Sequence, residues 1–225
     1  RYFGVPVDVD AGRITIEGGS RLIAAPLAVP GDPSSAAFLW AAAAAIPGSS
    51  IEVRDLLLNP TRTGFLRVLQ RMGALVEFEV TSRAPEEVGT VRVGAGPLRA
   101  TEVNAEEIPS LVDELPMLAV LATAAEGTTI IRGAEELRLK ESDRIEAVAT
   151  NLRALGVEVE TFADGLALCG PQRLRPGVVI SGGDHRVAMA FAIGALWADG
   201  PVDIMDAGCV DVSWPGFYEA LEALT

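Results

Sequence analysis

Residues 138–145 read Arg-Leu-Lys-Glu-Ser-Asp-Arg-Ile, and this charged stretch decides how the surrounding sequence is interpreted. Asp143 is a favoured helix N-cap, and Glu146 follows it by three residues, as in a capping box. Apolar residues then recur at helical spacing as far as Leu155. The stretch therefore predicts the start of an amphipathic helix, with Arg144 in its first turn.

The position of Arg144 is electrostatically unfavourable, because the N-terminal end of a helix carries partial positive charge. A cation there costs about 0.3–1 kcal/mol. Arg186 repeats the arrangement, since it follows Asp184 and opens an apolar helix. Each arginine could form an ion pair with its own N-cap, Asp143 or Asp184. The alternative is one shared anion site, in which both guanidinium groups bind phosphate or carboxylate.

Around this stretch the predicted elements recur in the order β-α-β-α-β-β, with a period of about seventy to eighty residues. Residues 1–19 read as a β-hairpin. Further strands are expected at 27–29, 50–55, 74–80, 90–93, 101–103, 128–132, 157–162, 165–168, 178–181 and 202–205. Helices are expected at 32–46, 59–72, 113–125, 143–155, 184–197 and from 214 onward.

Marker residues support this repeat. Asp32, Asp113 and Asp184 each fall where the first helix of a unit begins. Gly73 and Gly156 fall where a second helix ends, as left-handed caps do. The repeat predicts an α/β fold class, with three units at about 22–97, 98–172 and 173–225.

The third of these units lacks its closing hairpin, and the hairpin at 1–21 has no unit before it. We therefore expect residues 1–21 to close a unit of a missing N-terminal domain. Residues 22–225 are expected to form a C-terminal domain, so that about one of two such domains is present.

Composition limits the classes of function. The net charge of −13 and the lack of a basic stripe argue against nucleic-acid binding. The apolar run 36–46 is too short to span a membrane. Cys169 and Cys209 are isolated and His185 is the single histidine, which predicts reduced thiols in a cytoplasmic protein without a structural zinc site. Neither a P-loop nor a dinucleotide-binding motif is present, so no cofactor is expected.

Three further residues are candidates for catalysis. Asp113 lies in an otherwise apolar stretch, so it is read as a helix N-cap or as a carboxylate whose pKa is raised for work as a general base. The two roles are compatible, since one oxygen can cap while the other faces a cleft. Lys140 and Glu141 could be solvated charges. Lys140, however, precedes the helix and gains nothing from the negative end of the helix dipole.

Several segments carry a resemblance to a known family, and they occur in a specific order. They are Pro-Gly-Asp-Pro-Ser-Ser-Ala (30–36), Val-Asp-Glu-Leu-Pro (112–116), Gly-Thr-Thr (127–129) with Arg-Gly-Ala-Glu-Glu-Leu (132–137), Lys-Glu-Ser-Asp-Arg (140–144) and Asp-His-Arg-Val-Ala-Met (184–189). With these segments the chain resembles the C-terminal half of the 5-enolpyruvylshikimate-3-phosphate (EPSP) synthase family over essentially all 225 residues.

The resemblance implies an inside-out α/β barrel, the enolpyruvyl transferase-like fold, in which two similar domains bind substrates between them. It implies transfer of the enolpyruvyl group of phosphoenolpyruvate to the 5-hydroxyl of shikimate 3-phosphate, with release of phosphate, in aromatic amino-acid biosynthesis. No metal or cofactor is implied. By motif match, Asp113 contacts shikimate 3-phosphate and acts as base, Lys140 lies near the 5-hydroxyl, and Glu141 exchanges protons with the methylene group. Arg144 and Arg186 bind phosphoenolpyruvate.

Two positions depart from the pattern of some family members. Glu136 stands where some have an asparagine that contacts shikimate 3-phosphate, and Val212 stands where some have a lysine that touches phosphoenolpyruvate. The remaining substrate-binding residues belong to the N-terminal domain, so we expect a monomer that is inactive without it. Two alternatives stay open: a UDP-N-acetylglucosamine enolpyruvyl transferase, and a non-catalytic half-domain that binds anions.

Overall fold

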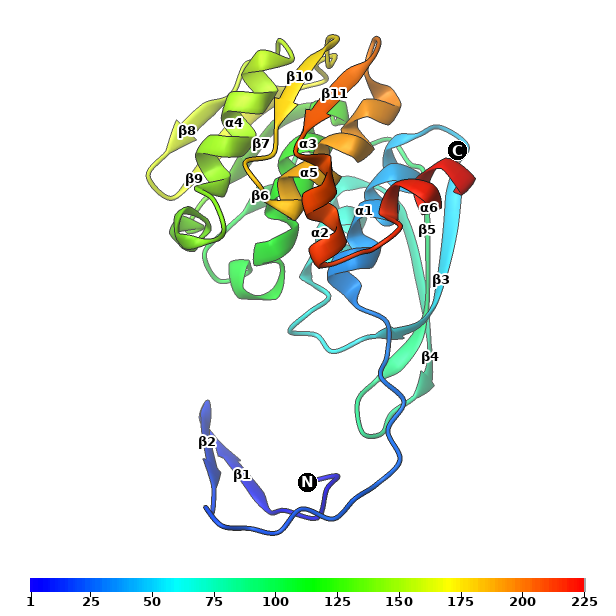
Figure 1. The fold of residues 1–225 in the computed structure, drawn as a ribbon, viewed down its shortest axis with the longest axis vertical. Helices are drawn as coiled ribbons and strands as arrows, with labels where there is room; N and C mark the ends of the chain where they lie inside the picture. Colours follow the sequence, from blue (N-terminus) through cyan, green and yellow to red (C-terminus); the bar gives the residue numbers. More distant parts are fainter. Residues whose placement is uncertain (225) are drawn as a thin grey trace.

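The computed structural model describes residues 1–224. An α/β body carries a separate N-terminal hairpin, which hangs from it on an extended connection (Figure 1). The hairpin consists of β1 (Val7–Asp10) and β2 (Arg13–Ile16), paired antiparallel with Val7 opposite Ile16. This confirms the hairpin predicted at 1–19.

The first part of the body contains helix α1 (Pro33–Ala45), strand β3 (Ser50–Leu57) and helix α2 (Gly64–Met72). Strands β4 (Leu75–Ser82) and β5 (Val88–Gly94) follow, and the antiparallel sheet has the order β3-β5-β4. Helix α2 ends at Gly73, which has a φ of 102°, as predicted for a left-handed cap.

The second part contains β6 (Glu102–Val103), α3 (Leu115–Leu121), β7 (Gly127–Ile131), α4 (Arg144–Ala154), β8 (Glu160–Phe162) and β9 (Gly165–Gly170). Its sheet order is β6-β7-β9-β8, with only β6 and β7 parallel. Short 3₁₀ turns surround α3 and precede α4; they are Ile108–Ser110, Val112–Glu114, Ala122–Ala124 and Glu135–Leu139.

The third part contains β10 (Gly177–Ile180), α5 (His185–Gly194), β11 (Val202–Met205) and α6 (Phe217–Leu224). Strands β10 and β11 pair in parallel and form a sheet of their own. Two 3₁₀ turns, Ala195–Trp197 and Ala207–Val212, complete this part. The order of elements in the body therefore follows the predicted one, apart from its first strand.

The strand predicted at 27–29 is wrong. This stretch is an extended connection, and only Gly31 bridges to Leu56 of β3. Pro26 and Pro30 flank the stretch and have no N–H to donate to a ladder. The side chain of Val29 is 85% exposed, so no packing favours pairing.

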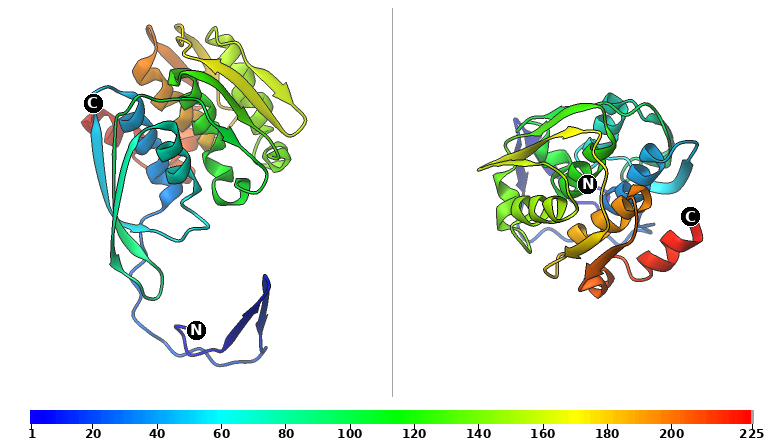
Figure 2. Two further views of the ribbon diagram at one scale, coloured as in Figure 1. Left: turned by 180° about the vertical axis from the view of Figure 1, so that it is seen from behind. Right: turned by 90° about the horizontal axis from the view of Figure 1, so that it is seen from above.

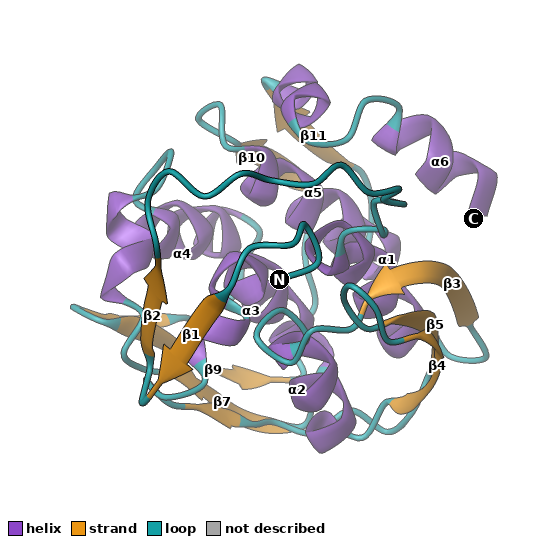
Figure 3. Ribbon diagram, turned by 90° about the horizontal axis from the view of Figure 1, so that it is seen from below, coloured by secondary structure: helices purple, strands orange, loops and turns teal. Residues whose placement is uncertain are grey.

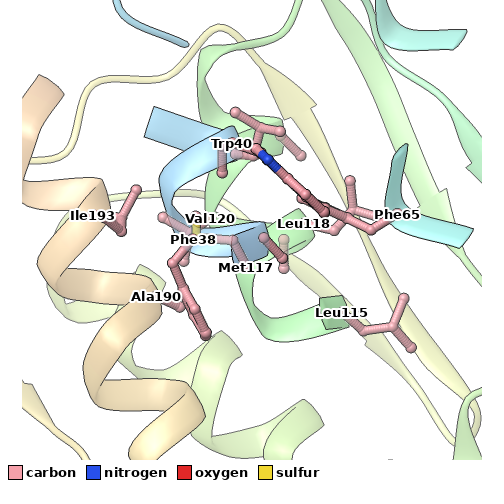
Figure 4. Packing of buried hydrophobic residues seen from close by; sticks show 14 of the residues in the cluster. Phe38, Trp40, Phe65, Leu115, Met117, Leu118, Val120, Ala190 and Ile193 are labelled. Carbon is pink, nitrogen blue, oxygen red and sulfur yellow. The ribbon is translucent and has the colours of Figure 1, made fainter. Parts of the chain in front are cut away.

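Helices α1, α3 and α5 lie at the centre of the body with the sheets around them (Figures 2 and 3). All seven residues of α3 are buried, as is most of α1. A helix covered on every side has to be apolar all round, which is why these segments are so rich in alanine and leucine. Figure 4 shows the packing of Phe38 and Trp40 of α1 against neighbours from α3 and α5.

None of the helices in residues 1–224 combines the length and the apolar character that a membrane crossing requires.

Candidate functional site

The N-terminal ends of the three central helices and of α4 carry the polar groups of the site. Asp32 caps α1 by accepting a hydrogen bond from the Ser35 amide at 2.9 Å. Asp184 caps α5 by accepting one from the Arg186 amide at 2.9 Å. The guanidinium of Arg186 in turn donates to the Ser34 carbonyl at 3.3 Å, which joins the start of α5 to the start of α1.

Asp113 does not cap α3, so the predicted N-cap role is wrong. It lies in the 3₁₀ turn Val112–Glu114, and Glu114 holds the N-cap position without making a capping hydrogen bond. The turn places Asp113 one residue too early to reach the free amides of the helix. Its carboxylate is directed instead to a guanidinium, that of Arg144.

Arg144 is the centre of the site. Its side chain is 2% exposed and binds three carboxylates: Nε lies 2.9 Å from Asp184, Nη1 3.0 Å from Asp113 and Nη2 2.6 Å from Glu141. These carboxylates compensate a buried cation at the positive end of α4, where it would otherwise be strongly unfavourable. An anion that bound Arg144 would displace one of these three carboxylates.

The predicted ion pair between Arg144 and its own N-cap is wrong. Asp143 caps α4 as predicted, by accepting from the Glu146 amide at 3.1 Å. Its other oxygen binds Arg138 at 2.7 Å. The N-cap is therefore already engaged, and Arg144 finds its partners on other elements.

Opposing effects act on the pKa of Asp113. Burial works to raise it, but the positive charges of Arg186, Lys140 and Arg144 together hold the pKa below its ordinary value. The expected raised pKa is therefore wrong for the site without a bound anion. Because the charges of three cations act on this one carboxylate, Asp113 is ionised.

Burial and ion pairing also act in opposite directions on the pKa values of Arg144 and Asp184, which form a buried pair. Burial opposes ionisation of both groups. The hydrogen bonds between them raise the pKa of the guanidinium and lower the pKa of the carboxyl. Ser142 adds a hydrogen bond to Asp184 at 2.9 Å. Both groups are therefore charged, and each stabilises the charged form of the other.

Lys140 and Glu141 precede α4, as predicted, and Glu141 binds Arg144 of this pair. The Lys140 ammonium is 3.7 Å from Asp113 and 3.2 Å from Glu136. Glu136, one of the two departures from the family pattern, thus forms an ion pair with Lys140. The other, Val212, is 83% exposed.

Ion pairs link four of the five predicted site residues, which are Asp113, Lys140, Glu141 and Arg144, and the charge of the fifth, Arg186, acts on Asp113. Sequence reasoning missed the interactions of Ser34, Arg62 and Glu114, and it offered Asp184 as a cap or as a partner of Arg186 but not as a partner of Arg144. Arg62 binds Asp32 at 2.9 Å and the Ser34 hydroxyl at 3.0 Å. The repeat contained a signal for Arg62, because it stands near the start of the second helix of its unit, as Arg144 does.

Within residues 1–224, no group of three or more His, Cys, Asp or Glu side chains could hold a metal ion. The three carboxylates of the site surround Arg144, which occupies the place that a cation would need.

A family model described as EPSP synthase (3-phosphoshikimate 1-carboxyvinyltransferase) matches residues 1–221. The chain is 46% identical over 217 residues to the 3-phosphoshikimate 1-carboxyvinyltransferase of Sulfurihydrogenibium sp. (strain YO3AOP1), covering 96% of this chain and 50% of that protein. It is 47% identical over 223 residues to the protein of the same name from Thermotoga neapolitana, covering 99% and 53%. The chain therefore spans about half the length of the curated relatives it matches.

Solved structures agree. An EPSP synthase from Acinetobacter baumannii superposes with a TM-score of 0.94 at 32% identity, covering 99% of this chain and 52% of that one. The enolpyruvyl transferase NikO from Streptomyces tendae gives 0.77 at 21% identity, covering 99% and 50%, and at that identity it shows the fold alone. These likenesses confirm the predicted enolpyruvyl transferase-like α/β fold.

Proposed function

Because this chain belongs to the EPSP synthase family, we propose that it forms one half of a 3-phosphoshikimate 1-carboxyvinyltransferase. That enzyme transfers the enolpyruvyl group of phosphoenolpyruvate to the 5-hydroxyl of shikimate 3-phosphate and releases phosphate. The observation that carries the proposal is the convergence of Lys140, Arg144 and Arg186 on Asp113. Both substrates are anions, and fixed cations at helix N-termini suit them.

Binding of phosphoenolpyruvate would alter the balance of charge. Arg144 and Arg186 would share their positive charge with the substrate and stabilise ionised Asp113 less. The pKa of Asp113 would rise as a result, so the carboxylate would become a better base just when the 5-hydroxyl has to lose its proton. The low pKa of Asp113 before binding is thus compatible with its proposed role.

Binding of phosphoenolpyruvate would also free Glu141. Its carboxylate binds Arg144 at 2.6 Å, and its side chain is half exposed, so it is the most easily displaced of the three partners. A substrate anion that took its place on Arg144 would release Glu141 to accept a proton. A protonated Glu141 could then supply the proton that the methylene group of phosphoenolpyruvate takes up.

The chain spans about half the length of its relatives, and this bears on how the complete enzyme is divided. We infer that this chain is the C-terminal half, that the remaining substrate contacts come from an N-terminal half, and that the assembled enzyme is a cytoplasmic monomer. In this arrangement the chain by itself binds anions but does not complete the reaction. The names of the relatives favour this activity over UDP-N-acetylglucosamine enolpyruvyl transfer.

Phosphate release in the presence of both substrates tests the proposal. We expect turnover by a complete enzyme that carries this chain as its C-terminal half, and none by the 225-residue chain alone. Calorimetry with shikimate 3-phosphate, phosphoenolpyruvate and UDP-N-acetylglucosamine identifies the substrate. Tight binding of the UDP-sugar would overturn the proposal, and turnover by the chain alone would overturn the inferred division of the site.

A further inference from the structure

Glu114 is a buried carboxyl group for which neither the motif nor the proposed mechanism has a use. It ends the 3₁₀ turn Val112–Glu114, directly after Asp113, and it is 4% exposed. Its Oε1 atom is buried without a hydrogen-bond partner. A buried polar atom that is left unpaired costs about 1–3 kcal/mol, so its presence at this position requires an explanation.

Four polar groups influence Glu114, and one of them, Asp113, belongs to the same 3₁₀ turn. They are the Ser34 hydroxyl of α1, the guanidinium of Arg186 at the start of α5, the guanidinium of Arg62 before α2, and the carboxylate of Asp113. Burial raises the pKa of Glu114, and the charge of Asp113 adds to that effect. Ser34, Arg186 and Arg62 act in the opposite direction, but the pKa remains above its ordinary value.

Ser34 connects Glu114 with Arg186. Its carbonyl accepts from Arg186 at 3.3 Å, and its hydroxyl accepts from Arg62 at 3.0 Å. Ser34 is 2% exposed, and the start of α1 that carries it is packed into the body. A change in the Glu114 side chain would therefore shift Ser34, and with it the Arg186 guanidinium that the Ser34 carbonyl binds.

We propose that Glu114 is a positioning residue for Arg186: packed beside Ser34, it fixes where that guanidinium meets the substrate anion. The inference rests on the proposed function, in which the anion is phosphoenolpyruvate. In this arrangement Glu114 acts through Arg186 and does not touch the substrate, because its side chain is buried.

Protonation gives this role a measurable signature. A substrate anion bound to Arg186 adds negative charge near Glu114 and so favours its neutral form. Binding of the anion and protonation of Glu114 are therefore coupled, and each strengthens the other. As the pH rises through the pKa of Glu114, the ionised carboxylate competes for Arg186, and the KM for phosphoenolpyruvate rises.

The test uses steady-state kinetics of the complete enzyme carrying this chain, between about pH 5 and about pH 9. Glu114→Ala is expected to raise the KM for phosphoenolpyruvate about tenfold, which corresponds to about 1.4 kcal/mol. The KM for shikimate 3-phosphate should stay within about twofold. Glu114→Gln keeps the shape of a neutral carboxyl, so it should restore the KM at low pH and lose the rise that wild type shows with pH.

The control is Glu52→Gln, which changes a paired carboxylate on β3 away from the site. It corrects for effects of the buffer and for titration of the substrate phosphate. Three results would overturn the role of Glu114: an alanine variant that behaves like the control, equal increases in both KM values, or a glutamine variant with the wild-type pH profile.

The result can also be separated from the proposed function. If the complete wild-type enzyme shows no turnover but binds phosphoenolpyruvate in calorimetry, the proposed function fails, and the affinities of the same variants still decide the role of Glu114. If it neither turns over nor binds phosphoenolpyruvate, both proposals fail.

Discussion

Arg62 and Arg144 stand near the start of the second helix in two successive repeat units, and each binds the aspartate that stands at or before the start of its unit's first helix. Arg62 binds Asp32 at 2.9 Å, and Arg144 binds Asp113 at 3.0 Å. Their surroundings differ: the side chain of Arg62 is 46% exposed, whereas that of Arg144 is 2% exposed. The same pair is a surface feature in one unit and the centre of the candidate site in the other.

The difference comes from what the neighbouring unit adds. Arg144 is also bound by Asp184 from the third unit, and Glu141 covers its remaining nitrogen. Exposed ion pairs contribute about 0–1 kcal/mol, because water competes for both partners. A buried pair adds little on balance, but removing one partner leaves an uncompensated charge. Burial thus makes the stability of the protein sensitive to substitution in the Arg144–Asp113 pair.

Removing each arginine in turn is the strongest test of the difference between the exposed and the buried pair. Arg144→Ala leaves Asp184 buried without its main partner and should cost about 3–5 kcal/mol of unfolding free energy. Arg62→Ala should cost less than about 1 kcal/mol. Chemical denaturation of the 225-residue chain measures both. Equal losses for the two variants would show that burial does not distinguish the two units.

A smaller effect is expected from neutralising the aspartates that cap α1 and α5. Asn caps a helix as well as Asp does, so Asp184→Asn and Asp32→Asn keep the caps and remove only charge. We expect Asp184→Asn to cost about 1.5–3 kcal/mol through its charged hydrogen bonds to Arg144. Asp32→Asn should cost less than about 1 kcal/mol. A larger loss for Asp32→Asn would reverse the comparison.

The smallest expected effect is the response of stability to acid. The folded-state pKa values of Asp113 and Asp184 lie below their ordinary values, so their contribution is complete above the unfolded pKa of about 3.9. It is lost as the pH falls through the folded pKa values. Glu114 has the opposite sign, because its raised pKa makes a contribution that is lost as the pH rises. Unfolding measured between about pH 2 and about pH 6 should show Asp184→Asn flattening the acid limb by on the order of 1 kcal/mol. If the acid limb of Asp184→Asn matches that of the wild type, the lowered pKa assigned to Asp184 is wrong.

Local features of this fold could be read from the sequence. The caps Asp32, Asp143 and Asp184 and the left-handed glycines Gly73 and Gly156 depend on a few neighbouring residues, and the structure confirms them. The predicted strand at 27–29 failed because a short apolar run indicates a strand only where a partner strand exists.

The site was predictable as a set of residues but not as a set of contacts. The family motif identified Asp113, Lys140 and Arg144. That Arg144 is bound by Asp184, forty residues away, follows from the packing of α4 against α5, which no local pattern encodes. Glu114 was missed because a buried carboxyl in an apolar stretch looks like any acidic residue beside a helix.

Asp32 and Asp184 cap their helices, whereas Asp113 does not, and this matters for how a repeated architecture can evolve. Asp32 and Asp184 serve the fold, and losing the capping oxygen of either one disturbs a helix start. In the second unit the 3₁₀ turn at Asp113 leaves its carboxylate free of that role. Selection can therefore act on Asp113 without first unfolding a helix, so repetition gives this fold one position at which chemistry can change while the scaffold is preserved.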